Sequence, residues 1–129
     1  MPESETLVTR IRTAVAHLPE VTERSSHGAP TFFIRGKKAL VSLWAEGHHD
    51  DDFPHLCCAA ADGVQGELIA ADPQTFFRPP YVGHLGWIGV RLDTGISDDE
   101  LAELCEDAYR VVAPATLVRQ LDADLGRRG

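Results

Sequence analysis

Apolar residues recur at helical spacing near both ends of the chain. Near the N-terminus they form one face of a 3.6-residue repeat, made by Leu7, Ile11, Ala14, Val15 and Leu18. This pattern predicts an amphipathic helix over about residues 5–17, which Pro19 ends. Near the C-terminus, Ser97 and Glu100 form a capping box before a helix whose apolar face is Leu101, Leu104, Cys105, Ala108 and Val112. Pro114 then opens a last helix with the stripe Leu117, Val118, Leu121 and Leu125.

Between these helices the pattern is typical of short strands. Residues 31–35 and 39–45 form a hairpin around Gly36-Lys37-Lys38, and residues 56–60 and 87–92 form two more predicted strands. Residues 21–26 are extended and precede a break at Gly28-Ala29-Pro30. Asp62 with Gln65 predicts the capped start of a short helix over residues 64–71. This order predicts an α+β fold, in which an antiparallel sheet is flanked by N-terminal and C-terminal helices.

Length and composition limit the number of domains and the class of protein that the chain can form. A chain of 129 residues with 43% hydrophobic and 25% charged residues is expected to form one domain, residues 1–129. No apolar run approaches the length of about 20 residues that spans a bilayer, and the acidic N-terminus does not resemble a signal peptide. We therefore expect a cytoplasmic protein with no membrane partner. The odd count of three cysteines argues against a disulfide framework.

The adjacent pair Cys57 and Cys58 should point to opposite faces of a strand, and Cys105 falls on a helical apolar stripe. We interpret all three as small apolar core residues.

Charge changes the functional expectations more than composition does. The net charge is −8, yet residues 1–45 hold six bases against four acids, whereas residues 46–129 hold six bases against sixteen acids. Most of the surface should therefore repel a phosphate polyanion, and any contact with nucleic acid must come from a local basic patch.

Two segments resemble a known family. The stretch Phe76 to Asp93, with Pro-Pro-Tyr-Val-Gly-His followed by Gly-Trp-Ile-Gly-Val-Arg-Leu-Asp, and the segment Glu106 to Pro114 are similar to the MmcQ/YjbR family of small bacterial proteins. The resemblance spans nearly the whole chain. It implies a fold like that of bacterial frataxin homologues, and it implies DNA binding by hairpins that act as paired wings.

Carried over to this chain, the DNA-binding expectation falls on the turn with Arg35, Lys37 and Lys38. Three cations at a hairpin tip can contact phosphates, and so few contacts predict weak, salt-dependent and sequence-indifferent binding. Lysines at such a tip also serve solubility alone.

A second candidate site lies in the segment that carries the resemblance. Tyr81, His84, Trp87 and Arg91 combine aromatic rings with an imidazole and a guanidinium, which could form a pocket for a planar or anionic small molecule. Alternatively, Tyr81 and Trp87 anchor the loop to the core, and we favour this anchoring.

Other chemistry is weakly indicated. His48, His49, Asp50, Asp51, Asp52 and His55 offer metal ligands, but adjacent residues in a loop define no fixed geometry, so we favour a solvated loop and predict no metal and no cofactor. Gly83, Gly86 and Gly89 match neither a dinucleotide fingerprint nor a phosphate loop, and we expect a binding protein rather than an enzyme. The acidic helix that begins at Asp98 is a solvated face or a docking surface for a basic partner.

Overall fold

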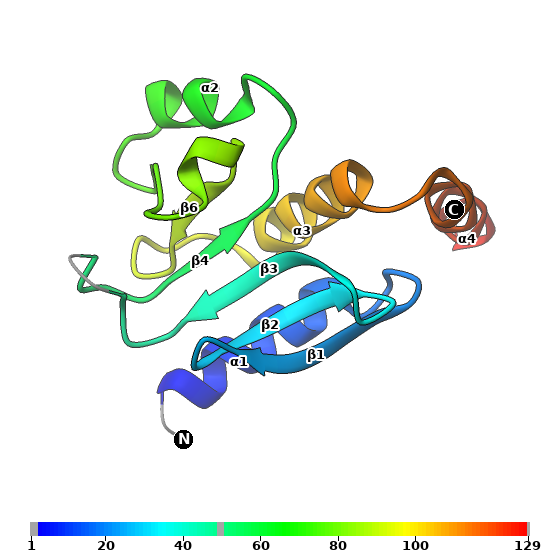
Figure 1. Cartoon of the computed structure of the whole chain (residues 1–129), viewed down its shortest axis with the longest axis horizontal. Helices are drawn as coiled ribbons and strands as arrows, with labels where there is room; N and C mark the ends of the chain where they lie inside the picture. The colour runs from blue at the N-terminus through cyan, green and yellow to red at the C-terminus, as the bar shows by residue number, and fades with distance from the viewer. Residues whose placement is uncertain (1–2, 49–50, 129) are drawn as a thin grey trace.

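A six-stranded antiparallel sheet forms the centre of the molecule, as the computed structural model shows for residues 3–48 and 51–128 (Figure 1). The strand order is β1-β2-β3-β4-β6-β5. The strands are β1 (Val21–Ser26), β2 (Ala29–Ile34), β3 (Lys38–Trp44), β4 (His55–Cys58), β5 (Phe76–Phe77) and β6 (Ile88–Arg91). The helices are α1 (Glu3–Val15), α2 (Val64–Ala71), the short 3-10 helix η1 (Gly83–Leu85), α3 (Asp98–Val112) and α4 (Ala115–Arg128).

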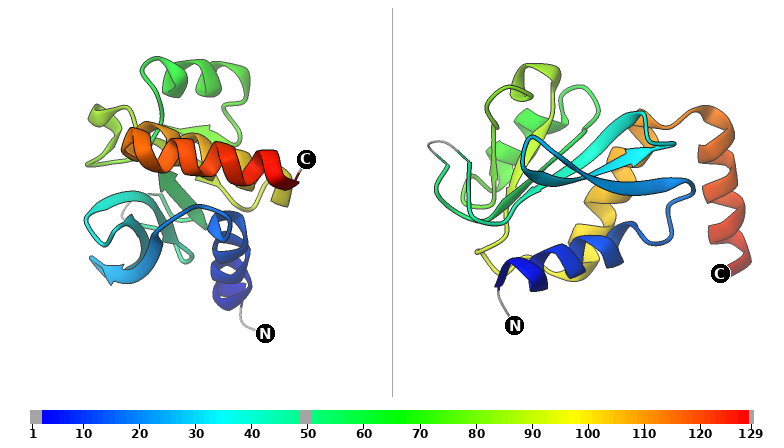
Figure 2. Two further views of the ribbon diagram at one scale, coloured as in Figure 1. Left: turned by 90° about the vertical axis from the view of Figure 1, so that its right-hand side faces the viewer. Right: turned by 60° about the horizontal axis from the view of Figure 1, so that its bottom comes forward.

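The hydrophobic core lies between the sheet and two helices. Figure 2 shows α1 and α3 side by side beneath the sheet, and α4 at one end of it. Ile11 of α1 and Leu101 and Cys105 of α3 are fully buried, as are Val41 of β3 and Val90 of β6 on the sheet face that they cover. Alternate residues on each strand therefore serve this core, and the intervening ones form the opposite face.

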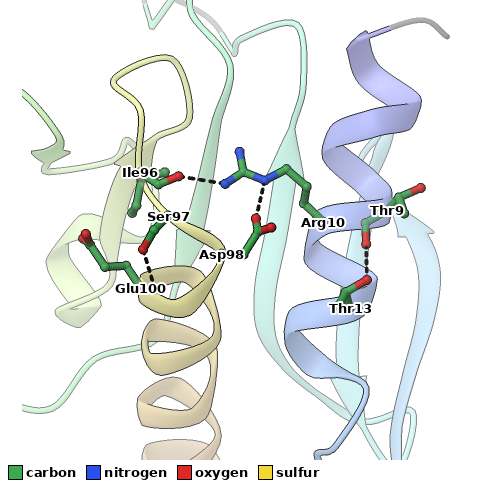
Figure 3. A network of polar contacts seen from close by, with 7 residues as sticks. All are labelled: Thr9, Arg10, Thr13, Ile96, Ser97, Asp98 and Glu100. Carbon is green, nitrogen blue, oxygen red and sulfur yellow. Dashed lines mark hydrogen bonds and ion pairs between the residues drawn. The ribbon is translucent and has the colours of Figure 1, made fainter.

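Polar contacts fix the helices at defined points (Figure 3). The Arg10 guanidinium on α1 donates to the Asp98 carboxylate at 2.7 Å and to the Ile96 carbonyl oxygen at 2.8 Å, which ties α1 to the start of α3. At the other end of α3 the buried Tyr109 hydroxyl donates to the Pro19 carbonyl oxygen at 2.9 Å. These two contacts hold α3 against the N-terminal segment along its length.

The predicted α+β order and most of its elements are confirmed. The Ser97 hydroxyl accepts from the Glu100 amide at 3.1 Å, as the capping box requires. Cys57, Cys58 and Cys105 are buried, as expected of core residues. Leu117 and Leu121, which belong to the apolar stripe predicted for α4, are buried.

Two local predictions are wrong, and one short strand was not predicted. The break placed at residues 28–30 is instead a two-residue turn, His27-Gly28, and β2 begins at Ala29. Both turn residues have positive φ, 53° and 81°, which matches the twist of the flanking strands. The cap predicted for α2 is also absent, because Gly63 occupies the N-cap without any side-chain cap and Gln65 bonds elsewhere. Phe76 and Phe77 form the short edge strand β5, which the pattern did not indicate.

Across residues 3–48 and 51–128, none of the helices combines the length and the apolar character needed to cross a membrane.

Candidate functional site

The sheet face opposite α1 and α3 carries a pocket of about 670 Å³. Its floor is made by alternate residues of β2, β3 and β4, and its walls come from the β1–β2 turn, the segment after β3 and the loop that precedes β6. The lining residues are Ser26, His27, Thr31, Phe33, Ala39, Ser42, Trp44, His48, Cys57, Pro80, Tyr81, Val82 and Trp87. A volume of this size is typical of small-molecule sites.

Strand register explains why this face is hollow. Thr31 lies opposite Ser42, and Ser42 lies opposite Cys57, so three small residues form one row across β2, β3 and β4. Residues opposite one another in antiparallel strands share a face. Phe33 and Trp44 lie on either side of this row. The hollow is therefore bounded by aromatic rings and floored by two hydroxyls and a thiol.

The Cys57 thiol is a polar neutral group in this floor. Burial raises the pKa of Cys57 to about 12, and the nearby Asp51 carboxylate acts in the same direction. The thiolate is the reactive form of cysteine, so at neutral pH this side chain is a weak hydrogen-bonding group rather than a nucleophile.

The loop over the pocket is held by a residue far away in the sequence. The Gln65 amide nitrogen donates to the carbonyl oxygens of Gly83 and Trp87, at 2.9 and 2.6 Å. Gly83 also permits close packing, because a Cβ there would lie 2.6 Å from Cγ of Arg78. These contacts place Pro80, Tyr81 and Val82 along one wall of the pocket.

Tyr81 has an unusual conformation in this loop. Its φ is 66°, which is uncommon for a bulky residue, and 70% of its surface is exposed. Backbone strain of this kind is concentrated at functional sites. The favoured anchoring role does not describe Tyr81, whereas half-buried Trp87 does pack against the core.

An imidazole already stacks on the pocket's indole wall. The rings of His48 and Trp44 lie 3.7 Å apart between centroids with an angle of 17° between planes, and Tyr81 lies 5.9 Å from His48. The arrangement shows that Trp44 presents a face to planar groups.

The other two predicted ligand-binding residues lie outside the pocket lining. His84 is exposed on η1. Arg91 donates to the Asp93 carboxylate at 2.9 and 2.7 Å, and its guanidinium carbon lies 4.0 Å from the centre of the Phe53 ring. The structure thus brings Tyr81 and Trp87 together and leaves His84 and Arg91 apart from them.

The three predicted DNA-contacting bases lie at the β2–β3 turn, at the end of the sheet nearest α4 (Figure 1). The Arg35 guanidinium is paired with the Glu20 carboxylate through two contacts of 3.2 Å. Lys37 and Lys38 are exposed and form no ion pair within the part of the chain that the structure describes. Of the three bases predicted to contact DNA, Lys37 and Lys38 are therefore available for phosphate contacts and Arg35 is already paired.

The predicted metal-ligand loop is only partly described, since His49 and Asp50 lie outside the described residues. Among residues 3–48 and 51–128 no group of three or more histidine, cysteine, aspartate or glutamate side chains is arranged to hold a metal ion. His55 is fully buried, and its Nδ1–H donates to the Phe53 carbonyl oxygen at 2.9 Å.

Sequence reasoning missed Gln65 and the row of Thr31, Ser42 and Cys57. The row has no local signal, because its members belong to three strands. Small polar residues at alternate positions of strands were its only trace in the sequence.

Comparisons with known proteins agree with this architecture. The family model described as YjbR matches residues 16–111. The crystal structure of a Deinococcus radiodurans protein with a DUF419 domain superposes with a TM-score of 0.69 at 19% sequence identity, covering 89% of this chain and 87% of that one. At this identity the likeness concerns the fold alone. No curated protein matches the chain.

Proposed function

The chain belongs to the YjbR family, and from the geometry of its sheet we propose that it binds a small, neutral, planar molecule in the pocket beneath the loop of residues 78–87. The observation that supports this most directly is the row of small residues between Phe33 and Trp44, because it leaves about 670 Å³ open beside aromatic rings.

The lining chemistry favours a neutral ligand over an anionic one. Among the described residues that line the pocket there is no aspartate, glutamate, lysine or arginine. The guanidinium of Arg24 lies beside the pocket, 3.7 Å from the centre of the Phe33 ring, but it donates to the Gly36 carbonyl oxygen at 2.7 Å. The Trp87 indole lines the pocket together with the Trp44 indole, one face of which is covered by the His48 imidazole, and the hydroxyls of Thr31 and Ser42 can donate or accept hydrogen bonds. Such a lining orients a planar heteroaromatic molecule through a few hydrogen bonds.

Intrinsic fluorescence tests this proposal directly. The chain has two tryptophans, Trp44 and Trp87, and both line the pocket, so their emission reports on its occupancy. With excitation at about 295 nm, where the probes absorb weakly, we expect at least one of adenine, cytosine and uracil to change the emission saturably in the range from micromolar to millimolar. Cyclohexanol, which is not planar, should not do so.

A filled pocket provides the control. Ser42→Leu should abolish the response because the larger side chain occupies the hollow, whereas Ser25→Leu makes the same chemical change on an exposed residue of β1 outside the lining and should preserve it. Equal responses of the two variants, or no response to any planar probe in the wild type, would contradict the proposal. Circular dichroism shows whether each variant is folded.

DNA binding is a second candidate function, supported by exposed Lys37 and Lys38 next to each other at the β2–β3 turn. With two free cations, log K should fall with log salt concentration at a slope of about −2. Fluorescence anisotropy with mixed-sequence duplex DNA at low and moderate salt measures this slope. Binding that is absent at low salt, or that is unchanged in the Lys37→Glu/Lys38→Glu variant, rules this function out.

A further inference from the structure

Helix α2 leaves apolar surface uncovered. Its sequence, Val-Gln-Gly-Glu-Leu-Ile-Ala-Ala, is mostly apolar, yet none of its residues is buried. Val64, Leu68 and Ile69 are only partly covered. An isolated helix of eight residues is not stable in water, so its apolar side needs packing partners. Part of that side is free for an external one.

A groove of about 550 Å³ runs between α2 and α3. Its floor includes Cys58 and the run Ala59 to Ala61, whose short side chains leave room above them. Leu68 of α2 and Leu104 and Val111 of α3 add larger apolar groups, and 48% of the surface of Val111 is exposed. An apolar groove between two helices is a known form of receptor for an amphipathic helix.

One rim of this groove is acidic. Glu100, Glu103 and Asp107 lie three and four residues apart along α3, so they share one face of the helix, and all three line the groove. None of the three forms an ion pair within the described residues. Arg110 also lines the groove, but its guanidinium is engaged by Asp122 at 2.8 Å and by Glu106 at 3.7 Å.

The acidic rim is only partly compensated by positive charge. Partial burial raises the pKa of the Asp107 carboxyl, and the adjacent Glu106 carboxylate raises it further, whereas the Arg110 guanidinium lowers it. Because Arg110 forms its ion pairs with Asp122 and Glu106, a cation supplied by a partner would meet carboxylates of Glu100, Glu103 and Asp107 that have no ion-pair partner among the described residues. Because the floor of the groove is apolar and its rim is acidic, the groove favours an occupant that is apolar on one side and basic along its edge.

We propose that the groove between α2 and α3 is a docking site for a basic amphipathic helix of a partner protein. The apolar face of this helix packs on Leu68, Leu104 and Val111, and lysines or arginines one turn apart pair with Glu103 and Asp107. The eight residues of α2 span about 12 Å, which matches two to three turns of the partner.

This site is separate from the small-molecule pocket. Cys57 lines the pocket and the next residue, Cys58, lines the groove, because successive residues of a strand point to opposite faces. Occupancy of the groove can be followed without changing the lining of the pocket.

Two synthetic peptides of identical composition test the proposal. The first is an 18-residue leucine and lysine peptide with leucines on one helical face, fluorescein-labelled, and the second is its scramble without helical periodicity. We expect the amphipathic peptide to bind about tenfold more tightly by fluorescence anisotropy. In a ¹⁵N-labelled sample it should shift amide resonances of α2 and the exposed face of α3. Equal binding of both peptides overturns the proposal.

Variants locate the site. Glu103→Lys should weaken binding of the amphipathic peptide about tenfold, and Val111→Gln should weaken it without any change of charge. Glu46→Lys makes the same charge reversal at an exposed acid after β3, outside the groove, and should leave the affinity unchanged. If Glu46→Lys weakens binding of the peptide as much as Glu103→Lys does, the peptide is attracted only by the net charge of the protein, and the proposal is overturned. Dimerisation of the wild type that Val111→Gln abolishes would assign the groove to a second copy of this chain, and it would overturn the proposal equally.

Discussion

At the scale of single residues, His55 is a titratable group packed against aromatic rings. It is fully buried, and Nδ1–H donates to the Phe53 carbonyl oxygen, while Nε2 has no hydrogen-bond partner among the described residues. The rings of Phe53 and Phe77 pack against it at 5.4 and 5.2 Å between centroids. Burial lowers the pKa of His55, and the Phe53 carbonyl and the Asp51 carboxylate oppose this only in part.

This environment predicts a loss of stability in acid. The folded protein holds His55 neutral, whereas the unfolded chain takes up the proton near the ordinary value of 6.5. Stability from this group is therefore complete above pH 6.5 and is lost as the pH falls toward the lower folded pKa. Each tenfold difference in proton affinity is worth about 1.4 kcal/mol.

Urea denaturation between pH 5 and pH 8 measures the effect. His55→Leu should have a flatter dependence of the unfolding free energy on pH than the wild type. Parallel curves for the two proteins would show that His55 does not contribute.

A second prediction at this scale concerns the effect of Gly89 on stability. A Cβ there would overlap the ring of Phe77, which lies on the β6 backbone where a side chain would otherwise project. Gly89→Ala should therefore lower the unfolding free energy by about 1–3 kcal/mol through overpacking. Phe77→Leu in the same chain should restore part of the loss. The matched control is Gly66→Ala on α2, where no atom lies within 4 Å of the new Cβ and a gain of about 0.5–1 kcal/mol is expected.

At the scale of elements, Arg10 makes the polar contacts between α1 and the start of α3 that Figure 3 draws. The Asp98 side chain is 78% exposed, so its ion pair with Arg10 is screened by water and contributes less than about 1 kcal/mol. The bond from Arg10 to the Ile96 carbonyl oxygen is part-buried and contributes more.

Arg10→Met should accordingly lower the unfolding free energy by about 1–2 kcal/mol, since it keeps the apolar stem and removes both donors. Asp98→Asn should cost less than Arg10→Met. Urea denaturation of both variants checks the order, and a reversed order would assign the contact to the ion pair.

At the scale of the whole molecule, many of the positively charged side chains form ion pairs with carboxylates of the same chain. Five arginines are paired with carboxylates within the described residues, namely Arg10, Arg12, Arg35, Arg91 and Arg110. With a net charge of −8, the protein has little free positive surface for a polyanion. For this reason we favour small-molecule binding in the pocket over DNA binding at the β2–β3 turn.

The three cysteines report on the integrity of the whole fold. All are buried, and burial raises the pKa of Cys57 and of Cys105 to about 12 and that of Cys58 above its usual range. Neither condition for thiol reactivity, exposure or a thiolate, is met in the native state. A thiol-reactive dye such as 5,5′-dithiobis(2-nitrobenzoate) at pH 8 should label three thiols per chain in urea and none rapidly without it. One rapid native equivalent would instead indicate access to Cys57 through the pocket.

The sequence alone was sufficient for features that depend on near neighbours. Helical periodicity located α1, α3 and α4, the Ser97 cap was visible in four residues, and Cys57 and Cys58 were correctly placed on opposite faces. Each of these features follows from backbone geometry over a few residues, so a local pattern is enough to reveal it.

The tertiary structure alone decided the candidate site. The hollow requires Thr31, Ser42 and Cys57 to fall in one row, which depends on the register of three strands. Gln65 was predicted to cap its own helix, but in the fold it holds carbonyl groups about twenty residues further along the chain. Strand register and distant hydrogen-bond partners result from packing of the whole chain, and no local pattern encodes them.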